Sequence, residues 1–281
     1  MSNLRTIQAL ITPQMISEGA GVRLLRSFAP RQSNLYDPFL LFDHFAFNDL
    51  SDDPIPGFPM HPHRGIETVT YLLEGSVRHG DNLGNSGEIA AGDVQWMTSG
   101  RGILHEEMPK RNAKGQITGF QLWVNLPAAQ KMTHPRYQEV RADQIPILKQ
   151  NGLEVRLVAG SLDGVAGPVK DIAIAPLYME ARMNPGARFS IPVNREHTVL
   201  LYLFSGSIRI AEQSVEKIQM VVIEDGDVVE VESGMQGARF MLISGKPIRE
   251  PIAPYGPFVM NTMEEIQQAL VDLRNGTFVK S

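Results

Sequence analysis

Residues 67–78, with the sequence Glu-Thr-Val-Thr-Tyr-Leu-Leu-Glu-Gly-Ser-Val-Arg, resemble residues 197–209, with the sequence His-Thr-Val-Leu-Leu-Tyr-Leu-Phe-Ser-Gly-Ser-Ile-Arg. Both stretches are rich in β-branched and aromatic residues, which predicts a strand, and both reach a Gly-Ser turn. A Gly-Asp turn follows each of them, at residues 91–94 and 225–228, and opens a further strand. The second half of the chain therefore looks like a copy of the first, and the repeated hairpins predict antiparallel sheets that close into barrels or sandwiches.

The repeat predicts an all-β chain of two domains. We place the first domain at residues 1–130 and the second at residues 131–281, because the polar, proline-bounded stretch 127–135 is typical of a linker. The proline-dense stretch 246–257 is unsuited to a central strand, so we expect it to run extended over the surface. The second domain then includes this return segment and whatever follows it.

A helical pattern occurs near the end of the chain. Thr262 and Glu265 have the spacing of a capping box, and Asn275-Gly276 supplies a stop signal. Four apolar residues between them fall on one face of a helix: Ile266, Ala269, Leu270 and Leu273. This pattern predicts a short C-terminal packing helix with a polar outer face.

Two segments of the first half carry side chains with metal-ligand chemistry. His61 and His63 are two residues apart, as are His105 and Glu107, and side chains two apart on a strand project to the same face. A lone His-X-His pattern is weak evidence, but two such pairs facing each other predict a site of three imidazoles and one carboxylate. These ligands suit a divalent first-row transition metal. His197 has no second histidine at this spacing, so we predict no comparable site in the second domain.

Composition excludes several classes of function. The net charge is −5 and no run of lysine or arginine is dense, so direct nucleic-acid binding is not expected. Cysteine is absent, which excludes disulfides and thiolate ligands. No apolar run approaches membrane-spanning length, and the N terminus has no signal-peptide pattern, so we expect a cytoplasmic protein. His44, His79 and His134 lack a partner at ligand spacing, and we expect them to be surface or hydrogen-bonded residues.

The sequence His-Pro-His-Arg-Gly at 61–65 and the sequence Gly-Arg-Gly-Ile-Leu-His-Glu-Glu-Met-Pro at 100–109 resemble the motifs of the pirin family of bicupins. The stretch 249–262 resembles the C-terminal segment of that family. The resemblance implies two cupin β-sandwich domains packed face to face, with one iron site in the first. It also implies four metal ligands: His61, His63, His105 and Glu107. Thr98 departs from the general cupin pattern, which has proline at this position.

Other residues near the predicted site have alternative readings. Glu67 shares strand parity with His61 and His63, but Gly65 is typical of a bulge that resets this parity, so we favour Glu107 as the ligand. Arg64 either orients a carboxylate beside the metal or forms a surface ion pair. The remaining candidates either line an apolar mouth or, as we favour, pack in the core: Phe58, Met60, Trp96, Met97 and Trp123.

The resemblance implies quercetin 2,3-dioxygenase activity, the O2-dependent ring cleavage of a flavonol at Fe2+, although other divalent transition metals suit the same ligands. Glu107 is the candidate base for the flavonol hydroxyl proton. The alternative is a metal-dependent or redox-dependent regulatory protein that binds a transcription factor or a metabolic enzyme, since the family includes such members. We expect a monomer, because two domains packed on each other satisfy their own apolar faces.

Overall fold

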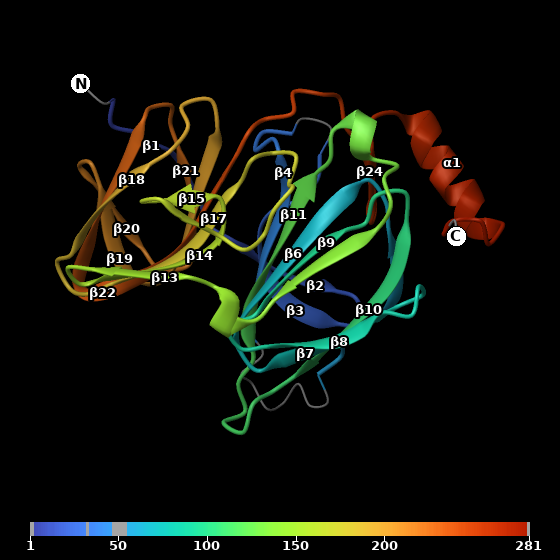
Figure 1. The fold of residues 1–281 in the computed structure, drawn as a ribbon, viewed down its shortest axis with the longest axis horizontal. Coiled ribbons are helices and arrows are strands. Elements are labelled where there is room, and N and C mark those ends of the chain that lie inside the picture. The colour runs from blue at the N-terminus through green and yellow to red at the C-terminus, as the bar shows by residue number, and fades with distance from the viewer. Residues whose placement is uncertain (1–2, 32–33, 47–54, 280–281) are drawn as a thin grey trace. The chain divides into compact units, whose positions relative to one another are not determined.

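The computed structural model describes residues 3–31, 34–46 and 55–279. Its regular elements are almost all β-strands in antiparallel pairs, accompanied in the described residues by short 3-10 helices and one α-helix, α1 (Met263–Arg274) (Figure 1). The predictions of an all-β chain and of a short C-terminal helix are therefore confirmed. Thr262 caps α1 in a capping box with Glu265, and Asn275 is its C-cap, as the sequence predicted.

The chain divides into two compact units, and each unit contains segments from distant parts of the sequence. One unit consists of Met1–Pro13 and Asp143–Pro247, and the other of Gln14–Ala142 and Ile248–Ser281. This division differs from the predicted one at both ends of the chain. β1 (Ile7–Ile11) pairs with β21 (Gln219–Ile223), so the first strand belongs to the unit of the second half. The C-terminal segment belongs to the other unit, where the Val259 N–H donates to the Arg64 carbonyl.

The unit that contains residues 143–247 is built on one sheet with the strand order β1-β21-β19-β22-β17-β14-β13, with β18 paired to β22 and β20 to β19. A separate hairpin pairs β15 with β16. The bounds of its strands other than β1 and β21 are β13 (Ile147–Gln150), β14 (Leu153–Ala159), β15 (Ser161–Leu162), β16 (Val165–Ala166), β17 (Leu177–Met183), β18 (Arg188–Pro192), β19 (Thr198–Ile210), β20 (Gln213–Glu216) and β22 (Val228–Gly245). Apolar side chains such as Leu201, Phe240 and Leu242 fill the core of this unit.

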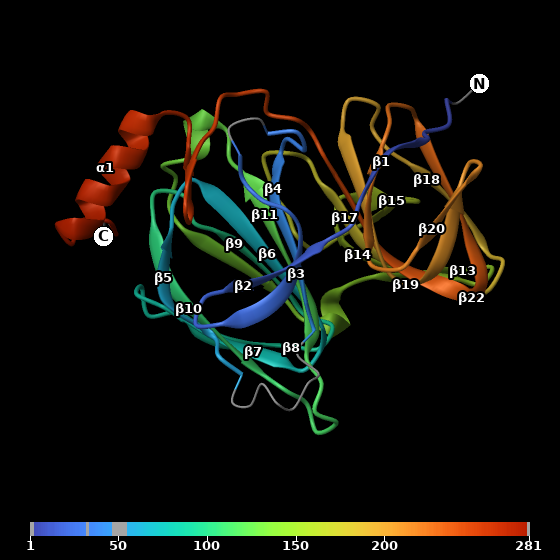
Figure 2. The ribbon, with the colours of Figure 1, turned by 180° about the vertical axis from the view of Figure 1, so that it is seen from behind.

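The unit that contains residues 14–142 has two main sheets, with the strand orders β12-β9-β6-β11-β4-β3-β2 and β5-β10-β7-β8. Their bounds are β2 (Gln14–Glu18), β3 (Val22–Phe28), β4 (Phe39–Ala46), β5 (Phe58–His63), β6 (Ile66–Glu74), β7 (Ser76–Asp81), β8 (Ser86–Ala90), β9 (Val94–Thr98), β10 (Ile103–Lys110), β11 (Thr118–Asn125) and β12 (Arg136–Val140). The hairpin of β23 (Ala253–Tyr255) and β24 (Phe258–Met260) joins this unit, and α1 contacts both of its strands. Figure 2 shows α1 at the edge of this unit, seen from behind.

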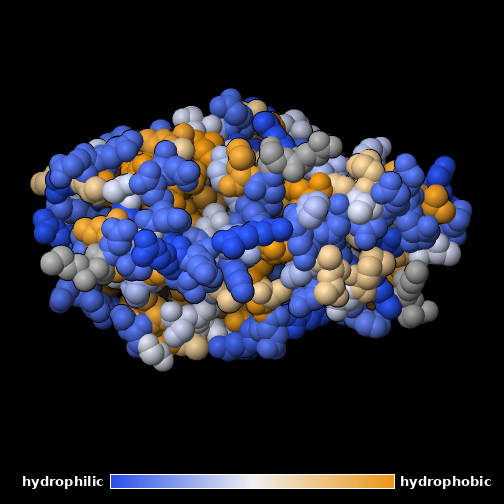
Figure 3. Space-filling model, turned by 90° about the horizontal axis from the view of Figure 1, so that it is seen from above, coloured by the Kyte–Doolittle hydropathy of each residue, from blue (hydrophilic) through white to orange (hydrophobic). Residues whose placement is uncertain are grey.

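The surface is mixed in polarity. On the face drawn in Figure 3, hydrophilic residues predominate and smaller hydrophobic areas lie between them. Within the described residues, no helix has both the length and the apolar composition needed to cross a membrane.

Two of the histidines outside the predicted site are buried. His79 on β7 lies 2.9 Å from the Glu139 carboxylate through its Nε2. His44 on β4 packs its ring against Phe120, with 5.0 Å between the ring centroids, and burial lowers the pKa of His44 to about 4. His134 is exposed.

We expect His44→Gln to flatten the dependence of the unfolding free energy on pH between about 4 and 6.5. The unfolded chain protonates His44 near pH 6.5, whereas the native state does so only near pH 4, so the unfolded state binds more protons in this window. The stability present above pH 6.5 is thus lost as the pH falls, by up to about 1.4 kcal/mol per pH unit. Urea unfolding of both proteins at several pH values tests this, and equal slopes would contradict it.

Candidate metal centre

Three predicted ligands meet where β10 pairs with β5. The antiparallel register places His105 opposite His61, and Ile103 opposite His63. One ring nitrogen from each of the three histidines lies within 4.8 Å of the corresponding nitrogens of the other two. The ring centroids are 4.4 Å apart for His61 and His105, and 5.1 Å apart for His63 and His105. The structure therefore brings together the three imidazoles that strand parity selected.

The nitrogen geometry fits a metal ion. Nε2 of His61 lies 3.2 Å from Nε2 of His63. Two nitrogens about 2.1 Å from one ion and at right angles around it lie about 3 Å apart, close to this separation. His105 is 1% exposed, and neither of its ring nitrogens finds a hydrogen-bond partner among the described residues. Buried polar atoms are rarely left unpaired, and a metal ion would satisfy one of these two nitrogens.

The surroundings keep the buried imidazoles neutral, which is the form that binds metal. Burial lowers the pKa of His63 well below its ordinary value, with a smaller effect from His105 and His61. Burial also lowers the pKa of His105 to about 3. Nδ1 of His63 lies 3.2 Å from the Pro257 carbonyl oxygen, which can only accept, so the proton sits on Nδ1 and Nε2 faces the other histidines.

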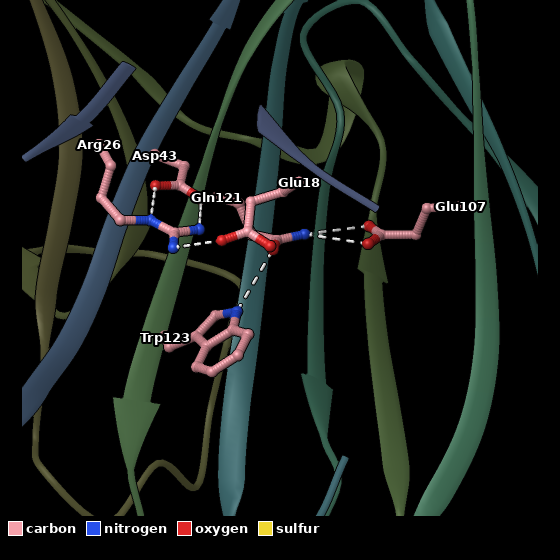
Figure 4. A network of polar contacts seen from close by, with 6 residues as sticks. All are labelled: Glu18, Arg26, Asp43, Glu107, Gln121 and Trp123. Atoms are coloured by element: carbon pink, nitrogen blue, oxygen red, sulfur yellow. Dashed lines mark hydrogen bonds and ion pairs between the residues drawn. The ribbon is translucent and has the colours of Figure 1, made fainter. Parts of the chain in front are cut away.

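Glu107 is close to this centre, but the group of ligand atoms does not include it. Its side chain is buried on the same face of β10 as His105, and it lines the same cavity as His61 and His63. The carboxylate accepts hydrogen bonds from Gln121 Nε2, at 3.0 and 3.2 Å (Figure 4). It also accepts from Thr70 Oγ1 at 3.3 Å.

The sequence patterns did not indicate Gln121 as a residue of the site. Its side-chain oxygen accepts from Trp123 Nε1 at 3.2 Å, so an indole that can only donate fixes which way the amide points. The available signal was parity, because Gln121 and Trp123 share one face of β11. The rings of Trp123 and His63 also meet in a T-shaped arrangement, with 5.0 Å between the ring centroids.

Strand β5 contains a bulge between Phe58 and His61. His61 lies opposite His105, but Phe58 lies opposite Glu107, so β5 has one more residue than β10 between these pairs. Phe58 lines the cavity, whereas Met60 is 49% exposed and is not among the lining residues.

Glu67 and Trp96 form a pair of their own. The Glu67 carboxylate accepts from Trp96 Nε1 at 3.0 Å and from Thr98 Oγ1 at 2.8 Å, and all three side chains are buried. Burial raises the pKa of Glu67. Neither Glu67 nor Trp96 lines the cavity. Thr98, the departure from the cupin pattern, thus supplies a hydroxyl that holds this carboxylate.

Arg64 forms an ion pair, but a buried one. Its Nη1 donates to Asp272 of α1 at 2.8 Å, and Nη2 donates to the Phe278 carbonyl at 3.0 Å. Nε donates to the Arg101 carbonyl at 2.6 Å, and the residue is 1% exposed. Neither predicted role fits, because the pair is not at the surface and the carboxylate that Arg64 binds belongs to the C-terminal helix.

His61 and His63 line a cavity of about 390 Å³. Leu41, Phe58 and Trp123 contribute apolar walls. Arg26 on another part of the lining donates to both oxygens of Asp43, at 2.8 and 2.7 Å, and to Glu18 at 2.7 Å (Figure 4). Apolar walls with a few fixed polar groups are typical of sites for small organic molecules.

Comparison with known proteins identifies the family. Residues 21–124 match the family Pirin, and residues 178–279 match the pirin C-terminal cupin domain. A pirin-like protein of Caulobacter vibrioides is 43% identical over 98% of this chain and 99% of its own length. This chain belongs to the pirin family. Human pirin is 41% identical to it over 98% of this chain and 94% of the human protein.

Among solved structures, this pirin resembles a quercetin 2,3-dioxygenase from Acinetobacter baumannii. The two chains are 32% identical, and the match covers 98% of each with a TM-score of 0.89. The bicupin resemblance inferred from the histidine motifs is therefore confirmed over nearly the whole chain.

Proposed function

We propose that this pirin is an Fe2+-dependent dioxygenase that cleaves the ring of a flavonol such as quercetin with O2. The observation that carries the proposal is the group of three histidines, two of which, His61 and His63, line a cavity of about 390 Å³ together with the Glu107 carboxylate. The likeness to a quercetin 2,3-dioxygenase supports the choice of substrate class.

His61, His63 and His105 would hold the ion. A bound Fe2+ ion would polarise a substrate hydroxyl oxygen as a Lewis acid and supply the redox chemistry that O2 requires. The apolar walls around Trp123 and Phe58 would take up the aromatic rings of the flavonol and exclude water.

Glu107 would accept the proton of the flavonol 3-hydroxyl. The Gln121 amide donates to both carboxylate oxygens, which orients the group. Thr70 supplies a further donor. The role of Glu107 as a fourth ligand, predicted from the sequence, stays a prediction, because the group of ligand atoms among the described residues contains only the three histidines.

The test is oxygen uptake by anaerobically purified, Fe2+-loaded protein after addition of quercetin, with His63→Ala as the matched control for free iron. We expect uptake in proportion to quercetin over many turnovers, and its loss in the variant. No uptake above the variant, with iron confirmed on the wild-type protein, would overturn the proposal and favour a metal-dependent regulatory protein.

Glu107→Gln separates the two roles of this carboxylate. We expect the variant to keep its metal and to lose about 100-fold or more in kcat, since general base catalysis contributes 10²-fold to 10⁴-fold. Metal content and kcat, measured on the same preparation, provide the check. Loss of the metal itself would instead identify Glu107 as a ligand.

A further inference from the structure

The tip of the C-terminal hairpin reaches the candidate metal centre. Gly256 and Pro257 connect β23 to β24, and both line the cavity. The Pro257 carbonyl is the acceptor for His63 Nδ1, across 194 positions of sequence. Such a carbonyl fixes the tautomer and orientation of a metal-binding imidazole, so the hairpin supplies part of the support of the centre.

The hairpin is fastened to the two residues that follow His63. The Val259 N–H donates to the Arg64 carbonyl at 3.2 Å. Lys131 Nζ donates to both the Gly65 carbonyl, at 2.9 Å, and the Val259 carbonyl, at 2.7 Å. Gly65 has φ of +81°, and a Cβ there would collide with the Val259 carbonyl oxygen. The close approach of β24 therefore requires glycine at this position.

Helix α1 and the residues after it extend this attachment. Arg64, next to His63, binds Asp272 and the Phe278 carbonyl, and its guanidinium carbon lies 4.3 Å from the Phe278 ring centroid. Leu104, next to His105, packs against an apolar cluster of the C-terminal segment: Ala253, Phe258, Met260, Ile266, Ala269 and Phe278. Both ligand-bearing segments thus contact the end of the chain.

We propose that residues 253–279 are a positioning element of the metal centre, so that metal binding and docking of this segment stabilise each other. The inference rests on the metal site of the proposed function, and it does not depend on dioxygenase activity. Such coupling is reciprocal. The factor by which bound metal lowers the equilibrium constant for opening of the segment equals the factor by which opening of the segment weakens metal affinity. The outer face of α1 is then less mobile in metal-loaded protein than in metal-free protein. A partner can recognise the metal-loaded state only if the two states differ at the surface that it binds, and this face provides such a difference.

Co2+ is the probe for the first test, because its affinity can be measured by competition with a chelator without any substrate. Once binding to the wild-type protein is established, we expect Asp272→Ala and Phe278→Ala to weaken it by about 10-fold to 100-fold, the usual effect of losing support around a ligand. Gln267→Ala, an exposed position on the same helix, is the matched control and should change it less than about 2-fold.

Hydrogen exchange of the unsubstituted protein provides the second test, which does not depend on whether the variants fold. We expect Co2+ to slow amide exchange of residues 253–279. Unchanged exchange there would overturn the inference, as would variants whose segment exchanges faster but which bind Co2+ like the wild type. If either of these contradicting results is found in a protein that still consumes O2 with quercetin, only this inference is wrong and the proposed function stands. If Co2+ binding and segment docking are coupled but quercetin causes no O2 uptake, only the proposed dioxygenase function is wrong.

Discussion

Replacing His105 with alanine is expected to lower the affinity of this pirin for divalent metal by more than about 100-fold, since removing a ligand should cost more than removing the support of one. His105 is the most deeply buried of the three histidines, and both of its ring nitrogens lack a hydrogen-bond partner among the described residues. No other described side chain joins the group of ligand atoms to replace it.

The measurement is metal content after dialysis against a chelator, together with the shift of the unfolding temperature on addition of Co2+. A ligand that binds only the native state raises this temperature, so the wild-type protein should show a shift that His105→Ala lacks. His134→Ala is the control, because His134 is an exposed histidine outside the group. If His105→Ala bound Co2+ as the wild type does, the three-histidine centre would be wrong.

Local patterns allowed the prediction of this centre only in part. Strand parity depends on neighbouring residues alone, so it correctly grouped His61, His63 and His105. The orientation of Glu107 depends on Gln121 from another strand, which no local pattern reveals. Arg64 was ambiguous for the same reason, because its partner Asp272 lies 208 positions away.

The C-terminal helix shows both the strength and the limit of sequence patterns. Its capping box and stop signal are local, and the structure confirms both. Asp272 belongs by composition to a polar outer face, yet it is 7% exposed because Arg64 lies against it. The helix therefore contributes a buried ion pair with Arg64, in addition to the packing that its apolar spacing predicted.

The stretch 127–135 was predicted to be a linker, but it is part of the fold of its unit. Ala128–Gln130 forms a 3-10 helix, and Lys131 directly after it is 1% exposed. The Lys131 ammonium donates to the Gly65 and Val259 carbonyls and to Asn125 Oδ1, the last at 2.6 Å. Proline and polar residues were typical of a loop, and nothing local shows that two carbonyl oxygens from distant segments converge on one lysine.

Lys131→Met is accordingly expected to destabilise this unit by about 3 to 5 kcal/mol, because two buried carbonyls and one amide oxygen lose their hydrogen-bond donor, at about 1 to 3 kcal/mol for each unsatisfied group. Methionine fills similar space, so the loss reports on the hydrogen bonds more than on a cavity. Both tryptophans, Trp96 and Trp123, lie within residues 14–142, so their fluorescence during urea unfolding follows this unit.

Lys114→Met is the control for this measurement. Lys114 is exposed and lies in the same unit as Lys131, and substitutions at such surface positions usually change the stability by less than about 0.5 kcal/mol. A Lys131→Met protein as stable as Lys114→Met would mean that the three oxygens find other donors once the amine is gone. A large loss confined to Lys131→Met would instead show that a single buried lysine joins the strand after His63 to the C-terminal hairpin, and that this junction holds much of the stability of the unit.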